Sequence, residues 1–276
     1  MKPLLFALAL AWSQSAVAGV VTQPDPLPRA VVVDQDTLAT LDPVSLSANF
    51  VDRVIHGLPV DAHLELFRNL EAAALEQALP AQPQQLAFWL NIYNGYTQYF
   101  LQTDPTLYLE SRPDYFSREQ VPIAGAVLSL EQIEHGILRR GATIYTLGHI
   151  RLLFFRRAMV RQFAVDQVDY RIHFALNCGA LSCPPVLAYR AETVDAQLDA
   201  ISRYYLQQEA HYSAENDEVA VPALLRWFSA DFGSRQDKRE ILRKHGVLPA
   251  GVKPALRYRD YDWTLKIRNY ALFQPE

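Results

Sequence analysis

The chain is poor in cysteine and lacks the short motifs that identify several enzyme classes. It has only two cysteines, Cys178 and Cys183, among 276 residues. It has no HExxH motif and no paired CxxC motifs for zinc, no glycine-rich phosphate loop, and no GxSxG elbow. Nucleotide binding and serine-hydrolase chemistry are therefore disfavoured, and we expect no cofactor.

Long apolar runs are missing beyond the N-terminus. Every later run is interrupted by charge or proline, whereas a membrane span needs about 20 apolar residues. The first residues combine Lys2, a short apolar stretch from Leu4 to Trp12, and small residues up to Ala18. This pattern predicts a signal peptide over residues 1–18, since the stretch is too short for an anchor. We expect a periplasmic or secreted protein without a transmembrane segment.

Acidic residues outnumber basic ones, 30 to 26, which argues against a general nucleic-acid binder. The charge is uneven, because residues 139–162 contain no acid and six arginines. Two interpretations stay open for this stretch. It is either the solvated face of a helix or a basic rim for an anionic ligand.

The pattern of apolar residues predicts an α+β fold: a single helix-rich domain with a small, mostly antiparallel sheet. Three prolines make residues 19–45 an irregular lead, and the domain follows over 46–276. Helical spacing or capping signals predict helices, and period-two alternation predicts strands. The main expected helices are 43–78, 86–102, 129–141, 150–163 and 191–208, and the expected strands include 170–176 and 255–269.

The helix expected at 86–102 is apolar on all sides, which is typical of a buried helix. Asn91 and Asn94 lie on it, so their amides need hydrogen-bond partners inside the core.

The segment RIHFALNCGALSCPPV, residues 171–186, contains both cysteines. Cys178 ends the expected strand and enters a turn at Gly179, whose exposed amide can receive an oxyanion. His173 is at odd spacing from Cys178, which places it on the opposite strand face, so His135 is the better candidate base. Three interpretations remain: a functional thiol at Cys178, a structural or regulatory disulfide with Cys183, or two inert buried thiols.

A metal site is a weaker alternative. Glu131 and His135 share one helix face, and either His173 or Cys178 would complete a three-ligand set. No metal-binding motif supports this set, so we expect no metal.

Four motifs together resemble the domain of unknown function 547 (DUF547), a family of exported bacterial and plant proteins. They are AFWLNIYNGYTQYFL, SLEQIEHGILRRG, YRIHFALNCGALSCPPV and YDWTLK, and the resemblance spans residues 50–265. It implies the fold but no activity. The polar positions shared with the family are Asn91, Tyr93, Asn94, Glu134, His135, Gly136, His173, Asn177, Cys178 and Asp262.

This sequence departs from the family pattern at two points. Tyr170 stands where the family usually has a proline. The segment before residue 60 lacks the dG.vdY type of sequence that usually precedes the domain. Plant members keep a cysteine matching Cys178 but not always one matching Cys183, so the resemblance disfavours an obligatory disulfide.

We expect a thiol-dependent hydrolase or an acyl or amide transferase acting on a small-molecule or peptide substrate. Cys178 would attack the carbonyl carbon, and His135 would serve as base and acid. Further candidate site residues are Asn91, Asn94, Glu134, His173, Asn177 and Asp262. The alternative is a non-catalytic periplasmic module that binds a ligand or a partner.

Overall fold

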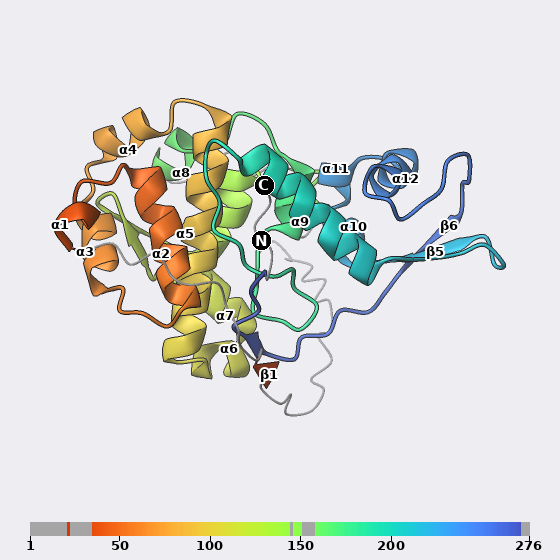
Figure 1. The fold of residues 1–276 in the computed structure, drawn as a ribbon, viewed down its shortest axis with the longest axis horizontal. Helices are drawn as coiled ribbons and strands as arrows, with labels where there is room; N and C mark the ends of the chain where they lie inside the picture. Colours follow the sequence, from red (N-terminus) through yellow and green to blue (C-terminus); the bar gives the residue numbers. More distant parts are fainter. Residues whose placement is uncertain (1–20, 23–34, 144–145, 151–157, 272–276) are drawn as a thin grey trace, which may run out of the picture.

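The structure is a computed structural model that describes residues 21–22, 35–143, 146–150 and 158–271 (Figure 1). The expected signal peptide, residues 1–18, lies outside the described residues, as does most of the expected N-terminal lead. Among the helices of the described part, none has the length and apolar composition needed to cross a membrane.

The long helix α5, Gln82–Thr103, is the centre of the fold. Its buried residues run almost without interruption from Leu86 to Gln98, which confirms the expectation of a buried helix. Helix α2, Pro43–Ile55, packs along it (Figure 1). The α2 helix begins at Asp42, whose carboxylate accepts hydrogen bonds from the backbone N–H groups of Val44 and Ser45.

Further helices surround this pair, and the single helix expected over 43–78 is divided into α2, α3 and α4. The helices before the disulfide segment are α1 Gln35–Leu38, α3 Asp61–Asn69, α4 Ala72–Ala78, α6 Thr106–Glu110, α7 Arg112–Ser117 and α8 Ala158–Gln162. Those after it are α9 Val194–Glu209, α10 Leu224–Trp227, α11 Ser229–Phe232 and α12 Arg235–Lys244.

Within the described residues the strands are short and form three small sheets, so the α+β class is confirmed. Strand β1, Val21–Thr22, pairs in parallel with β7, Lys266–Ile267. Strands β2, Val121–Ile123, and β3, Ala126–Leu128, are antiparallel. The third sheet has the order β4-β5-β6, and its strands are β4 His211–Ser213, β5 Glu218–Val221 and β6 Ala255–Tyr258. The β4–β5 pair is antiparallel and the β5–β6 pair is parallel.

The helix expected at 129–141 forms with its capping box. The Ser129 hydroxyl accepts from the Gln132 N–H, and the Gln132 side chain accepts from the Ser129 N–H, each at 3.1 Å. The centre of this helix, η1, Gln132–Leu138, is π-helical. Of the arginine-rich helix expected at 150–163, residues 158–162 are helical, and residues 151–157 lie outside the described residues.

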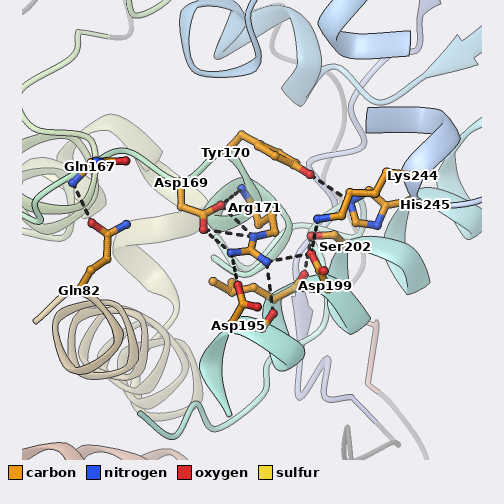
Figure 2. Close-up of polar contacts among 11 residues, drawn as sticks. Gln82, Gln167, Asp169, Tyr170, Arg171, Asp195, Asp199, Ser202, Lys244 and His245 are labelled. Atoms are coloured by element: carbon orange, nitrogen blue, oxygen red, sulfur yellow. Dashed lines mark hydrogen bonds and ion pairs between the residues drawn. The ribbon is translucent and has the colours of Figure 1, made fainter. Parts of the chain in front are cut away.

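The prediction of a strand at 170–176 is wrong, because residues Tyr170–Phe174 form a 3₁₀ helix, η4. Arg171 explains the difference: its guanidinium binds Asp169 and also reaches Asp195 and Asp199 of α9 (Figure 2). These bonds hold η4 against α9. The alternation of residues suggested a strand with one buried face. In the structure both sides of the segment are buried, so the alternation does not indicate a strand here.

Two apolar cores meet at η4. Ile172 and Ala175 belong to the large core around α5, whereas Phe174 belongs to a second core formed mainly by α9, β5 and α10–α12. The segment that carries His173 and Cys178 therefore lies at the junction between the cores.

Gly95 allows the close approach of α2 to α5. A Cβ atom at this position would lie 2.6 Å from Cδ1 of Phe50, which is fully buried. We expect Gly95→Ala to lower the free energy of unfolding by about 1–3 kcal/mol through overpacking, measured by urea unfolding.

The double variant Gly95→Ala/Phe50→Leu tests the cause. It should lose less stability than the sum of the two single variants, because the smaller side chain relieves the overlap. Strict additivity would contradict this account.

Candidate functional site

Cys178 and Cys183 are joined by a disulfide, so the loop between them is closed. Asn177 holds the loop from inside. Its Oδ1 accepts from the Gly179 N–H at 2.9 Å and from Gln98 of α5 at 3.0 Å, and its Nδ2 donates to the Pro184 carbonyl at 2.6 Å. Asn177 thus shapes the loop through hydrogen bonds that use both ends of its amide.

Two amides of α5 bind the chain on either side of the loop. Asn94 donates to the Ala175 carbonyl and accepts from the Asn177 N–H, each at 2.9 Å. Asn91 donates to the Tyr189 carbonyl at 2.7 Å and accepts from the Tyr189 N–H at 2.8 Å. Both asparagines are fully buried. The expected buried partners are therefore mainly backbone groups of residues 175–189, the stretch that contains the disulfide loop.

The hydroxyl of Tyr261 contacts both sulfur atoms, at 3.1 Å from Cys178 Sγ and 3.0 Å from Cys183 Sγ. A disulfide has no S–H, so the hydroxyl is the donor. Burial raises the pKa of Tyr261 well above its usual value, which keeps the proton on the oxygen. Cys183 Sγ also accepts from the backbone N–H of Cys178 at 3.0 Å.

Asp262 fixes the backbone next to Tyr261 against the loop. Its N–H donates to Ser182 Oγ at 2.9 Å, and its carbonyl accepts from the Ser182 N–H at 3.2 Å. The exposed carboxylate accepts a hydrogen bond from Thr264, which lowers the pKa of Asp262. Through these backbone hydrogen bonds to Ser182, Asp262 holds the neighbouring Tyr261 against the loop.

His135 lies on η1 and does not bond to the cysteines. Its Nδ1 accepts from Arg139 Nη1 at 3.0 Å, so the ring proton belongs on Nε2. Burial, together with the charge of Arg139, lowers the pKa of His135 to about 3. Within the described ranges no hydrogen bond joins His135 to Cys178. The imidazole is neutral and a weak base at neutral pH.

A buried ion cluster lies next to this histidine. Asp231 Oδ2 accepts from Arg139 Nε at 2.6 Å and from His173 Nε2 at 2.9 Å, and all three side chains are at most 1% exposed. Phe228 packs on two of them, with its ring centroid 3.9 Å from that of His173 and 4.6 Å from the guanidinium carbon of Arg139. Burial alone would raise the pKa of Asp231, but His173 and Arg139 outweigh it and lower the pKa.

Two members of this cluster, Arg139 and Asp231, were not among the site residues predicted from the sequence. Arg139 was counted within a solvated helix face or a basic rim, whereas its side chain is fully buried. Asp231 lies in α11, in the stretch SADFG, for which the sequence predicted no site residue. The sequence signal that could have identified Asp231 is an acidic residue placed next to apolar residues in that stretch.

Glu134 is a mostly buried acid beside the cluster. Its side chain is 15% exposed, and its carboxylate accepts a hydrogen bond from the Tyr93 hydroxyl. Burial raises the pKa of Glu134, although Arg139 and His173 act against the shift. Its carboxylate also lies 3.5 Å from His135 Nδ1.

The weaker metal hypothesis receives no support from the geometry. Across the described residues, no group of three His, Cys, Asp or Glu side chains is arranged to hold a metal ion. Glu131 is exposed, His173 is paired with Asp231, and Cys178 is in the disulfide.

Fold and site define an α+β domain whose disulfide loop is fixed to a buried central helix. Residues 77–206, just under half of the chain, match the model of a family described as a protein of unknown function, DUF547. This match supports the resemblance over three of the four motifs, and the fourth, YDWTLK, lies outside the matched residues. The match includes the disulfide loop and η1 but not Asp231 or Tyr261. No curated protein and no solved structure matches the chain.

Replacing Asp231 tests whether the buried cluster supports the fold. Asp231→Asn leaves Arg139 as a buried charge without its partner, and we expect the free energy of unfolding to fall by about 3 kcal/mol or more. The matched control is Asp195→Asn, because Asp195 also pairs with an arginine but is 85% exposed. The control should change stability by less than about 1 kcal/mol. Equal losses in urea unfolding would contradict the structural role of Asp231.

Proposed function

We propose that this chain is a thiol–disulfide exchange protein in which Cys178 and Cys183 alternate between a disulfide and a dithiol. One observation carries the proposal, the asymmetry of the disulfide. Cys178 is only partly buried, whereas Cys183 is 4% exposed. The Tyr261 hydroxyl contacts both sulfurs, but Cys183 Sγ also accepts a hydrogen bond from the Cys178 N–H.

The asymmetry sets the direction of attack. A thiolate of the substrate attacks Cys178 Sγ, the bond between the two protein sulfurs breaks, and its electron pair goes to Cys183 Sγ. The second thiol of the substrate, after losing its proton, attacks the substrate sulfur of the mixed disulfide and releases Cys178 as a thiolate. The substrate dithiol becomes a disulfide, the protein becomes a dithiol, and protons balance with solvent.

The contacts of Cys183 favour it as the leaving group. Exchange is faster when the departing thiol has a lower pKa, and hydrogen bonds to a thiolate lower that pKa. The Cys178 N–H already lies 3.0 Å from the sulfur that receives the charge, and the neutral Tyr261 hydroxyl, which also contacts Cys178 Sγ, lies at the same distance. Little reorganisation is then needed when the bond breaks.

The predicted signal peptide also supports this function. Export would bring the protein into a compartment where disulfides form and persist. A periplasmic or secreted location remains part of the proposal.

The hydrolase or transferase hypothesis needs a free Cys178 thiol and His135 as its base. The disulfide occupies Cys178, and a histidine with a pKa of about 3 is a poor proton acceptor near neutral pH. The non-catalytic alternative needs the disulfide to be purely structural. The geometry favours exchange over both because the attacked sulfur and the leaving sulfur have different surroundings.

Single-cysteine variants test the proposal. Cys183→Ser keeps the accessible thiol, and Cys178→Ser keeps the buried one. With oxidised glutathione, we expect the Cys183→Ser protein to form a mixed disulfide at least about tenfold faster, followed by mass spectrometry. Equal rates for the two variants, or a faster reaction of the Cys178→Ser protein, would contradict the proposed direction of exchange.

His135→Gln separates exchange from hydrolysis in the same assay. Exchange at Cys178 should keep its rate, since His135 has no bond to the sulfur. Ester or amide hydrolysis by the reduced protein that disappears in both Cys178→Ser and His135→Gln would support the hydrolase instead.

A further inference from the structure

Three aromatic rings form a cluster beside the disulfide. Trp227 at the end of α10 lies 4.9 Å from Tyr261 and 5.9 Å from Trp263 between ring centroids, and Tyr261 lies 4.7 Å from Trp263. All three side chains are partly buried. Tyr261 belongs both to this aromatic cluster and to the exchange centre, because its hydroxyl contacts the two sulfurs.

The arrangement of the rings limits what can bind. Trp227 stacks on Trp263 with an interplanar angle of 21°, and the guanidinium carbon of Arg112 lies 5.0 Å over the Trp263 ring. These neighbours compete for the flat faces that a sugar ring would need. The tilted rings, at 51° and 55° to Tyr261, instead offer an irregular apolar surface suited to an aliphatic or aromatic side chain.

We propose that the Trp227–Tyr261–Trp263 cluster is the substrate subsite of the exchange centre and binds an apolar side chain of a cysteine-containing polypeptide. This inference rests on the proposed function. A small dithiol needs contact only with Cys178 and would leave the rings exposed to water. A polypeptide that places an apolar side chain on the rings while its thiolate meets Cys178 gains affinity from the buried surface.

The selectivity of the exchange reaction between two peptides tests whether the aromatic cluster is a substrate subsite. Two reduced peptides, each with two cysteines and differing by Phe or Ser beside the first, are compared with dithiothreitol as reductants of the protein disulfide. We expect the Phe peptide to react about tenfold faster than the Ser peptide. Trp263→Ala should bring this ratio close to one, and Trp263→Phe should retain most of it. Tyr204→Ala, which removes an exposed aromatic from α9, is the control that keeps the ratio.

Binding without exchange gives a second readout. A Phe peptide with both cysteines replaced by serine is titrated calorimetrically into the full-length oxidised protein. We expect its affinity to fall at least about fivefold in Trp263→Ala and also in Trp227→Leu, with circular dichroism confirming that both variants fold.

The outcomes separate the two proposals. Equal rates for the Phe and Ser peptides, with a disulfide that dithiothreitol reduces readily, overturn the subsite alone. A disulfide that resists dithiothreitol overturns the exchange function, and the cysteine-free peptide then decides the subsite by itself. Binding of a soluble oligosaccharide that Trp263→Ala abolishes would overturn the assignment to a polypeptide.

Discussion

The hydrogen bonds from Asn91 and Asn94 to the backbone around the disulfide loop are the constraint on which the site depends. Both side chains come from the buried central helix α5, and each binds both a donor and an acceptor of the backbone around the loop. A buried amide that lost these partners would leave unpaired polar groups in the core, which is costly. These hydrogen bonds fix the backbone on both sides of the loop against α5.

Much of the fold could be predicted from local patterns. The all-round apolar character of residues 86–102 identified α5, and the Ser129–Gln132 capping box identified the start of η1. The failure at 170–176 has a physical cause. A buried segment with apolar residues on both sides satisfies the alternation of a strand, while a long-range network through Arg171 bends it into a 3₁₀ helix.

The candidate site could be predicted only in part, because its partners are far apart in sequence. The family motifs pointed to Cys178, Asn94 and Asn177, which the structure brings together. Nothing local indicated that Tyr261, 83 residues beyond Cys178, would contact its sulfur. His135 was expected to approach Cys178, yet its neighbour is Arg139, one helical turn away. The distances between residues in the fold, rather than the residue types, decide which histidine or hydroxyl group contacts a cysteine sulfur.

Reduction of the native protein by dithiothreitol shows whether the Cys178–Cys183 disulfide can exchange in the folded state. Free thiols are counted with and without a denaturant while circular dichroism monitors folding. An exchange protein with an accessible Cys178 sulfur should yield both thiols within minutes while it stays folded. A disulfide that opens only when the protein unfolds would be structural, and the account of its function would be wrong.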